Sequence, residues 1–582
     1  MKKSITRLLA LLLAVTMLLL TAGCAAPDTT QEQTEAPILM PESVEEVDCT
    51  ELGTPLADVR VRRALAHAID MDTIRKALFY GYGEKTGDFD GVLEPIAYDP
   101  QLSKELLAQA GWPSDYVLDV VYYHEDPQTE DFLKIVGSYW EAVGVKSEFH
   151  LLEGDLVSQL WKQPVEGEAS VPWDLAYSAV AALTDGEVYG RFASDASNNS
   201  HTLEIPGLDD LLDQAASTLN DQKRAELYGQ VRQILAENVS FIPLLHQNGF
   251  IYTSSHLDVA GTTHGNEQFA YDKNILNWTT DREDKTLYTD GGPVEFFVYP
   301  AVNPGLYLYQ ELIFERLIGA NSDLTPGEGQ LADCYTLSED GKTLEFVLKE
   351  NLLWHDEQPL TAEDVKFTFE LYMQCPGANA VLTGVLEQLE GAKAFLNGDA
   401  EECTGITVEE NKVVFQFEQA PVDLLTVFSQ WPVLPKHCLE GVNPEKLQQD
   451  KFWKNPIGSG PYKVTEAEMG RACTLERWEK YRETGEGNIE KILMRASGET
   501  DGNLVALAQR DLLDYAWGKS SDNAVCIDLV EGMTVEEVDI SYTRCFFVNQ
   551  YDHESHVATF HSLETTEMTE STEQTEETEP TK

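Results

Sequence analysis

The sequence predicts an α/β protein, because helix and strand patterns alternate along about 500 residues. Apolar residues make up 42% of the 582-residue chain and aromatic residues 9%, enough for sizeable cores. Apolar side chains recur at i, i+4 spacing in several segments, and β-branched or aromatic runs lie between them. Turn residues such as Gly111 and Gly341 separate the two kinds of segment. The length corresponds to about three or four domain-sized units.

The first half of the chain predicts helices with recognisable ends. Asp58 can cap a helix in which Val61 and Leu65 share one face. Asp70 or Asp72 begins the next helix. The further elements expected in this half are helix 102–110, strand 117–123, helices 208–219 and 224–237, and strand 240–245.

The second half repeats the mixture. Thr361 can cap a helix, with Glu363 and Asp364 in its positively polarised first turn. The strands expected around this helix are 342–348 and 412–417, and a tight turn at 458–461 precedes strand 462–464.

Both ends of the chain are expected to lie outside the folded part. Residues 25–54 are rich in Thr, Glu, Gln and Pro, and residues 551–582 end in repeated Thr-Glu steps. Such segments stay solvated, because their like charges repel one another and they have few large apolar side chains to bury. We therefore expect a flexible linker over 24–54 and a disordered acidic tail over 551–582.

The charge balance excludes nucleic acid as a partner. The chain carries 41 basic and 100 acidic side chains, so 41 − 100 gives a net charge of −59. Phosphate binding needs a basic face.

The first residues predict export and a lipid anchor. Lys2, Lys3 and Arg7 precede an apolar run over 8–20, which is typical of a signal peptide. The segment LTAGC over 20–24 resembles a bacterial lipobox, which implies a signal peptide of 1–23 and a lipid on Cys24. An ordinary signal peptide with a chance cysteine is the alternative. No later segment is apolar enough to span a bilayer, so we expect an anchor on the outer face of the cell membrane.

The other eight cysteines form no CxxC pair, so we expect neither a zinc ribbon nor a thioredoxin-like site. Export permits disulfides, but the spacing pairs none of them, and buried free thiols are the simpler interpretation.

Nine short segments, spaced along the chain, resemble those of one family. They are DVRVRRAL (58–65), SKELL (103–107), GW (111–112), RAELY (224–228), IPL (242–244), SEDGK (338–342), PLTAEDV (359–365), VLPKH (433–437) and PIGSGPY (456–462). Together they resemble the family 5 extracellular solute-binding proteins, the dipeptide- and oligopeptide-binding components of ABC importers. The resemblance covers about 55–550. One departure is Glu357-Gln358, where the family has Asp-Gly.

The two groups of motifs occur in the opposite order from that of the family. In the family, segments like PLTAEDV and PIGSGPY lie in the first half, and the one like DVRVRRAL opens the second. The chain therefore resembles one binding protein that is circularly permuted. The ordinary ends would be joined near 277–288, and the new ends would fall between 546–549 and 55–58. A fusion of pieces of two paralogues and a sequence assembly error are the alternatives.

The resemblance implies a bilobed, periplasmic-binding-protein-like fold of type II. Lobe 2, the family's C-terminal half, would be 55–237. Lobe 1 would gather 238–328 and 456–550, with 329–455 as an additional domain. The new ends would cut one of the family's two chain crossings and leave the one near 240–245. A domain-swapped dimer and a non-binding relic are competing architectures.

An enzyme is not expected. SDN (521–523) and KTG (85–87) resemble two β-lactamase motifs, but no Ser-x-x-Lys supplies a nucleophile. The sequence also lacks HExxH and a phosphate-binding loop. His553, His556 and His561 could hold a metal loosely, although a solvated tail is the simpler interpretation. No cofactor and no metal are therefore predicted.

The resemblance also suggests ligand-binding residues. Family peptide binders place an aspartate after a tryptophan to pair with the peptide amine. The corresponding stretch here runs from Trp173 to Glu187, and Leu183 stands near the key position. The candidates are Asp174, Tyr177 and Asp185 in this stretch, and Tyr299, Asn303 and Trp431 in segments that reach the cleft in relatives.

The resemblance thus predicts a lipoprotein that binds short peptides and delivers them to a membrane-embedded ABC permease and its ATPase. Another small solute, such as an oligosaccharide or a nickel complex, stays open, as does a relic without transport activity.

Overall fold

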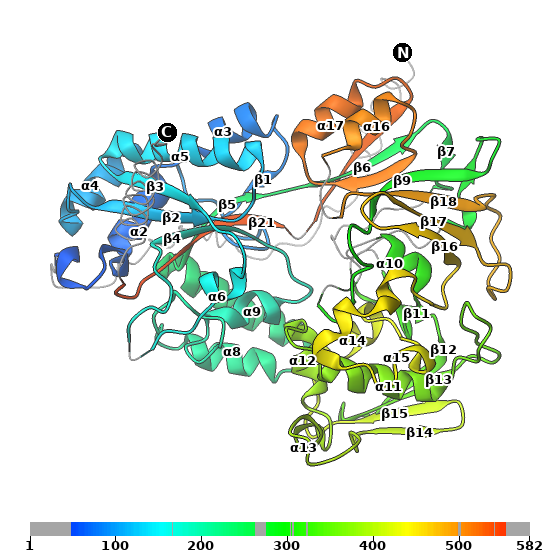
Figure 1. The fold of residues 1–582 in the computed structure, drawn as a ribbon. Helices are drawn as coiled ribbons and strands as arrows, with labels where there is room; N and C mark the ends of the chain where they lie inside the picture. Colours follow the sequence, from blue (N-terminus) through cyan, green and yellow to red (C-terminus); the bar gives the residue numbers. More distant parts are fainter. Residues whose placement is uncertain are drawn as a thin grey trace, which may run out of the picture. The chain divides into compact units, whose positions relative to one another are not determined.

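The α/β class is confirmed in the computed structural model. The structure describes residues 48–553 apart from 166, 262–274, 303, 305–307, 322–323, 499–501 and 541. Its two large sheets have six and seven strands, and a four-stranded sheet lies beside the larger one in the same core (Figure 1). We call the six-stranded sheet with its helices lobe 2, and the other two sheets with theirs lobe 1. No helix of these residues is both long and apolar enough to cross a bilayer.

Lobe 2 is built on a mixed sheet with the order β1-β5-β21-β4-β2-β3. β2 lies parallel to β3 and β4, whereas β21 is antiparallel to both of its neighbours. The strands are β1 (Glu84–Lys85), β2 (Val117–Tyr122), β3 (Lys146–Leu151), β4 (Leu175–Val180), β5 (Phe241–His246) and β21 (Thr543–Val548).

Helices cover both faces of this sheet. Phe546 packs among α2, α4 and α5 on one face, and the next residue, Phe547, packs among α8 and α9 on the other. The helical segments are η1 (Cys49–Glu51), η2 (Pro55–Ala57), α2 (Val59–His67), α3 (Met71–Leu78), α4 (Pro100–Ala110), α5 (Pro127–Val143), α6 (Leu156–Leu160), α7 (Asp185–Tyr189), η3 (Gly190–Phe192), α8 (Leu208–Ala216) and α9 (Asp221–Asn238).

Local signals set the ends of these helices as predicted. The Asp58 side chain accepts a hydrogen bond from the Arg60 amide at the start of α2, and Asp70 caps α3 in the same way. α4 ends at Gly111, whose φ of 73° lies in the left-handed region that favours glycine.

The seven-stranded sheet of lobe 1 has the order β16-β17-β18-β9-β19-β6-β20. Its strands are β6 (Gly249–Ser254), β9 (Thr286–Gly292), β16 (Tyr462–Glu468), β17 (Ala472–Arg477), β18 (Lys491–Ala496), β19 (Tyr515–Gly518) and β20 (Met533–Val538). The helices α10 (Leu308–Ile313), α16 (Leu504–Gln509) and α17 (Ser521–Asp528) belong to this part. Short pairs are β7 (Leu257–Asp258) with β8 (Thr279–Thr280) and β10 (Ile318–Ala320) with β11 (Pro326–Gly329), and η4 (Ile275–Asn277) precedes β8.

The four-stranded sheet lies wholly within the range expected for the additional domain. A capping box between Thr361 and Asp364 starts α11, as the sequence predicts. The strands are β12 (Ala332–Leu337), β13 (Thr343–Leu348), β14 (Ile406–Glu409) and β15 (Lys412–Gln416). The helices are α11 (Ala362–Met373), α12 (Ala380–Leu386), α13 (Ala392–Leu396), α14 (Leu424–Gln430), α15 (Lys436–Leu439), η5 (Pro444–Gln449) and η6 (Lys451–Lys454).

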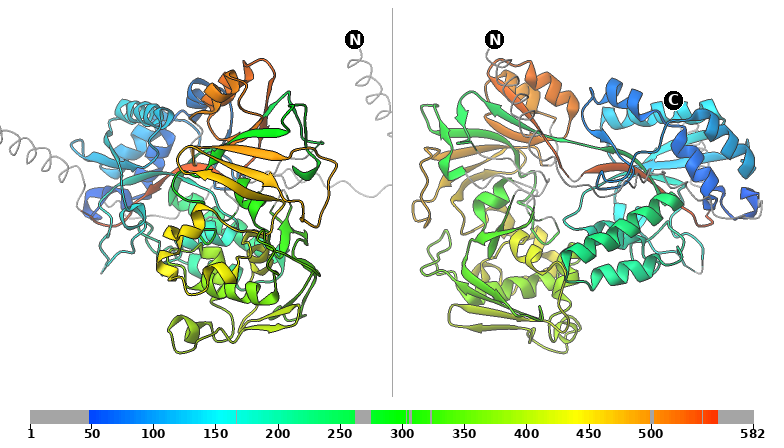
Figure 2. Two further views of the ribbon diagram at one scale, coloured as in Figure 1. Left: turned by 45° about the vertical axis from the view of Figure 1, so that its right-hand side comes forward. Right: turned by 180° about the vertical axis from the view of Figure 1, so that it is seen from behind.

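The chain crosses between the lobes twice, and the expectation of a single crossing is wrong. The first crossing joins β5 to β6 through Gln247, and the second joins β20 to β21 (Figure 2). The Gln247 amide donates to the Tyr542 carbonyl at 2.8 Å, so the crossings are bonded to each other. β5 and β21 pair with each other in the sheet of lobe 2. The expected limits at 237 and 550 placed both strands in lobe 1, so these limits are wrong.

Both ends of the described chain pack on lobe 2, so residues 48–54 and 551–553 belong to the folded part, whereas the rest of the expected linker and tail lies outside the described residues. Cys49 is fully buried in the core, and Nε2 of His553 lies 3.2 Å from the buried Asp174 carboxylate. A Cβ at Gly53 would meet the Asp552 Cβ at 3.2 Å, so the two ends lie next to each other. The burial of Cys49 and the contact between His553 and Asp174 thus hold residues that the composition predicts to be solvated. The expected sites at Cys24, His556 and His561 lie outside the described residues.

Candidate functional site

A cleft of about 830 Å³ lies where the two lobes meet the crossings. Lobe 2 contributes residues 123–128, which run from the end of β2 into α5. Lobe 1 contributes residues 289–291 of β9 and residues 515–523, which run from β19 into α17. Gln247 and Tyr542 line it from the crossings, and Arg544 lines it from β21. A smaller cavity of about 570 Å³ lies within lobe 1, beside α16 and α17.

The topology explains why these segments meet. β2 and β19 each end at the cleft and are followed there by a helix, α5 or α17. Loops after the carboxyl ends of strands form the usual ligand crevice of open α/β sheets. Asp126 caps α5 and Ser520 caps α17, which fixes both helix starts at the cleft. Gln128 of α5 also donates to the Ser521 hydroxyl at 2.9 Å and links the two lobes directly.

Aromatic side chains form the apolar part of the cleft. Tyr515 and Trp517 come from β19, Tyr123 from lobe 2 and Tyr542 from the second crossing. The Lys519 ammonium lies 4.0 Å from the centre of the Tyr542 ring, a cation–π contact. Flat walls of this kind suit ligands with extended backbones or rings.

Charged groups of both signs line the same cleft. The acidic ones are Glu125, Asp126, Asp290 and Asp522, and the basic ones are Lys519 and Arg544. Burial and the nearby Arg544 guanidinium lower the pKa of His124 to about 4, so this imidazole is neutral at pH 7. The cleft can therefore receive a ligand that carries both an amine and a carboxylate.

Two of the predicted residues lie inside lobe 2 and not among the lining residues. The fully buried Asp174 carboxylate accepts from the Tyr116 hydroxyl at 2.7 Å and from the Asp119 amide at 2.8 Å. Tyr177 is also fully buried, and its hydroxyl accepts from Arg544 at 2.8 Å. Burial raises the pKa of Tyr177 to about 12, so the hydroxyl stays protonated. Tyr177 therefore positions a lining residue.

Tyr299 and Trp431 lie in the core of lobe 1. Tyr299 packs against Tyr372 and Trp453, and the Trp431 indole donates to the Ala301 carbonyl at 3.4 Å. Neither is among the residues that line the cleft. Asn303 lies outside the described residues.

Asp185 belongs to a second contact between the lobes, away from the cleft lining. Its carboxylate lies 3.2 Å from Arg232. Glu187, two residues along α7, accepts from the Asn379 amide of lobe 1 at 2.9 Å. Asp423 of lobe 1 also faces this helix and interacts electrostatically with Asp185. We call Asp185, Glu187 and Asp423 the carboxyl contact.

Replacing Asp423 by asparagine is expected to raise the melting temperature at about pH 7 and to flatten its dependence on pH. Burial raises the pKa of Asp423 above its ordinary value of 3.8. A carboxyl whose pKa is raised by folding makes the fold less stable as pH rises through that value. The asparagine removes this destabilising charge. Thermal unfolding between about pH 4 and pH 8 measures the effect, with the exposed Asp399→Asn as control. Identical pH profiles for Asp423→Asn and wild type would refute it.

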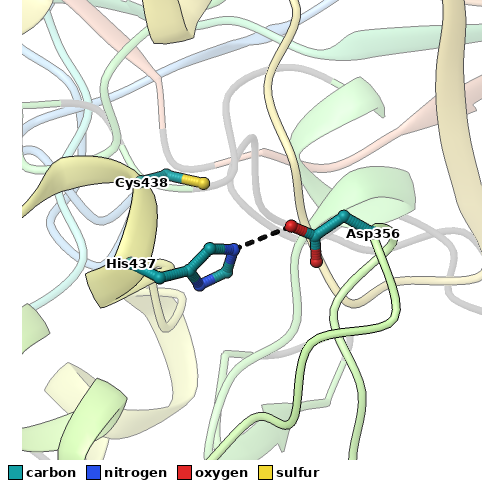
Figure 3. A group of neighbouring side chains, drawn as sticks. All are labelled: Asp356, His437 and Cys438. Atoms are coloured by element: carbon teal, nitrogen blue, oxygen red, sulfur yellow. Dashed lines mark hydrogen bonds and ion pairs between the residues drawn. The ribbon is translucent and has the colours of Figure 1, made fainter.

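Asp356, His437 and Cys438 lie within 4.8 Å of one another and form a group that could hold a metal ion (Figure 3). His437 Nε2 lies 2.9 Å from the Asp356 carboxylate, so these two already satisfy each other. Burial and the carboxylates of Asp356 and Asp364 raise the pKa of the Cys438 thiol to about 11. We interpret the group as a contact between α15 and the loop that joins β13 to α11.

The eight cysteines of the described chain are all free thiols, and Cys49, Cys403, Cys473 and Cys545 are buried.

Comparisons with known proteins identify the family of the chain. Residues 39–179 and 328–560 match the family described as bacterial extracellular solute-binding proteins, family 5 Middle. An ABC transporter peptide-binding protein of Brucella ovis is 27% identical over 224 residues, 38% of this chain and 39% of that protein. Heme-binding protein A of Haemophilus influenzae is 26% identical over 214 residues, 34% of this chain and 38% of that protein. The chain thus spans about two fifths of the length of these curated relatives. Among solved structures, an ABC transporter substrate-binding protein of Listeria monocytogenes is 24% identical, with a TM-score of 0.31 over 39% of this chain and 43% of that one.

Proposed function

Because this chain belongs to the bacterial extracellular solute-binding proteins of family 5, we propose that it captures short peptides outside the cytoplasm and delivers them to an ABC importer. The observation that carries the peptide assignment is the cleft between the lobes, with aromatic walls and charges of both signs. A peptide offers an amine, a carboxylate and a backbone that is common to every sequence. The binding involves no catalysis.

We expect the lobes to close on the bound ligand. The two crossings meet at Gln247, and both lobes contribute lining residues, so a bound ligand contacts both lobes. A ligand that contacts both lobes favours the closed arrangement by its differential affinity. The permease and its ATPase would then receive the closed, loaded protein.

A thermal-shift screen of peptides, oligosaccharides and metal chelates tests the ligand class. A ligand at 100 times its Kd stabilises the protein by about 2.7 kcal/mol. We expect short peptides to raise the melting temperature, and Trp517→Ala in the cleft to weaken that rise. Trp112→Ala, also half-buried but outside the lining, is the matched control. Stabilisation by oligosaccharides or chelates and by no peptide would overturn the peptide assignment while leaving solute binding intact.

Heme is a second ligand class, because one relative is a heme-binding protein. Adding heme to the same screen, with an absorbance spectrum as readout, distinguishes heme binding from peptide binding.

The lipid anchor on Cys24 and the circular permutation are part of the proposal. The adjacency of Gly53 and Asp552 supports the permutation, since a permuted chain needs its new ends close together. A reverse variant would join Asp552 to Gly53 by a short linker and open the chain between the exposed Glu283 and Asp284. We expect it to fold and to bind the same ligand. A soluble but unfolded reverse variant would contradict the permutation.

A further inference from the structure

We propose that His246 and Asp539 form a proton-dependent latch across the hinge between the two lobes. The protonated His246 ring holds the two crossings together, and loss of its proton loosens them. The inference goes beyond the proposed function, because it concerns the hinge and does not depend on which ligand the cleft takes.

The two residues of the latch belong to different lobes. His246 is the last residue of β5 in lobe 2, directly before the first crossing. Asp539 directly follows β20 of lobe 1, at the start of the second crossing. His246 Nε2 lies 3.1 Å from the Asp539 carboxylate. Hinges absorb domain movement in a few residues at the ends of elements, so this contact resists the movement of one lobe relative to the other.

The hydrogen bonds of the His246 ring select its protonated form. The Thr543 hydroxyl has one hydrogen, which it donates to the Phe89 carbonyl at 2.8 Å. The same hydroxyl lies 3.0 Å from His246 Nδ1 and therefore accepts from that nitrogen. The Asp539 carboxylate also accepts, so Nε2 is a donor as well. A histidine ring that donates from both nitrogens is an imidazolium.

The charges around the ring agree with this assignment. Glu84 of β1 lies opposite His246 in the sheet, which places its carboxylate on the same face. From β21, Thr543 adds no charge, and the next residue, Arg544, points to the other face. The hydrogen bond from His246 is the main cause that lowers the pKa of Asp539 below its ordinary value. Two carboxylates thus favour a positive charge on the ring.

The latch responds to pH in the range around neutrality. Because the joined crossings favour the protonated ring, their extra stability is fully present below the ordinary histidine pKa of about 6.5 and is lost as pH rises above it. A neutral ring has one donor for two acceptors and carries no charge. Mild acid therefore favours the joined arrangement, and a higher pH favours separate movement of the lobes.

The carboxyl contact is the competing source of a pH response between the lobes. Burial raises the pKa of both Glu187 and Asp423 above their ordinary values. A rise in pH therefore charges these acids and weakens that contact too. The carboxyl contact belongs to α7 and the start of α14, whereas the latch belongs to the crossings. Variants that remove one source at a time distinguish the two.

Hydrogen exchange of the Gln247 amide tests the latch directly, because this amide donates to the Tyr542 carbonyl between the crossings. Exchange is measured on the full mature chain without ligand at about pH 5.5 and about pH 8, on either side of the ordinary histidine pKa. Each rate is divided by that of the unfolded chain at the same pH, so that the ratio reports the opening of the structure.

The variants remove the latch from either side. His246→Gln removes the ring, and Asp539→Asn removes the carboxylate of a side chain that is 71% exposed. Asp423→Asn changes the carboxyl contact and leaves the latch intact. The matched control is His437→Gln, which removes a histidine–aspartate pair of 2.9 Å that lies within lobe 1.

We expect the protection of Gln247 in the wild type to be about 2- to 5-fold higher at the lower pH, the size of a partly exposed ion pair. His246→Gln and Asp539→Asn should have equal protection at both pH values, while Asp423→Asn and His437→Gln keep the difference. Nitrogen NMR of histidine-labelled protein should show protons on both nitrogens of the His246 ring at the lower pH.

Three results would overturn the latch. They are equal protection of the wild type at both pH values, a pH difference that persists in both latch variants, and a His246 ring with a single proton at the lower pH. Loss of the difference in Asp423→Asn alone would assign the response to the carboxyl contact instead. If His246→Gln does not fold, Asp539→Asn and the NMR signal that it shifts still decide the matter.

Discussion

Replacing Phe546 by alanine is expected to lower the free energy of unfolding of lobe 2 by about 3–5 kcal/mol. The Phe546 ring is fully buried at the centre of the sheet, with ring centres 5.3 Å from Trp140 and 5.4 Å from Tyr177. Its removal leaves a cavity between β21 and α5, which the surrounding side chains cannot fill. The effect should fall on lobe 2, although Phe546 lies near the other end of the sequence.

Hydrogen exchange followed by mass spectrometry measures this effect strand by strand. Protection in β2, β4 and β5 should fall by a factor of about 100 or more, while β17 and β18 keep theirs. Leu529→Ala removes a side chain that is 82% exposed and should change protection little. Weakened protection in β6 and β20 together with unchanged protection in β4 and β5 would show that β21 does not belong to lobe 2.

Replacing Cys24 by alanine is expected to move the protein from the membrane fraction to the soluble fraction. A lipid on Cys24 would be the attachment, because covalent acyl chains hold a protein on a bilayer. Fractionation, with the intact mass of the chain, measures both attachment and processing. The exposed Cys526 gives the control variant Cys526→Ala, which should stay in the membrane fraction. A fully processed, membrane-bound Cys24→Ala protein would refute the anchor.

Several helix ends could be predicted, because the residues that set them are close to them in the sequence. The Asp58 and Thr361 caps and the Gly111 stop each act within one helical turn. The place of β21 was not predictable in this way. Every residue of this strand is buried, so it shows no alternation, and its partners β4 and β5 lie hundreds of residues away. This long-range pairing is also why the second crossing was missed.

Only some of the residues around the cleft could be predicted from the sequence. Asp174 and Tyr177 were proposed from a family pattern, but strand alternation places Tyr177 on the face that packs against α5. One signal could have found Arg544. It is the single charged residue in the otherwise apolar run TRCFFV, and a charge in a doubly buried strand needs a partner or a function.

The central claim is that both halves of the sequence form one protein that binds a peptide between its lobes. Native mass spectrometry of the freshly purified mature chain tests it most directly. The predicted result is a monomer carrying one peptide, which is released on unfolding and is bound again when a tripeptide pool is added. A dimer that exchanges halves, or a monomer that carries a ligand other than a peptide and ignores the tripeptides, would contradict the claim.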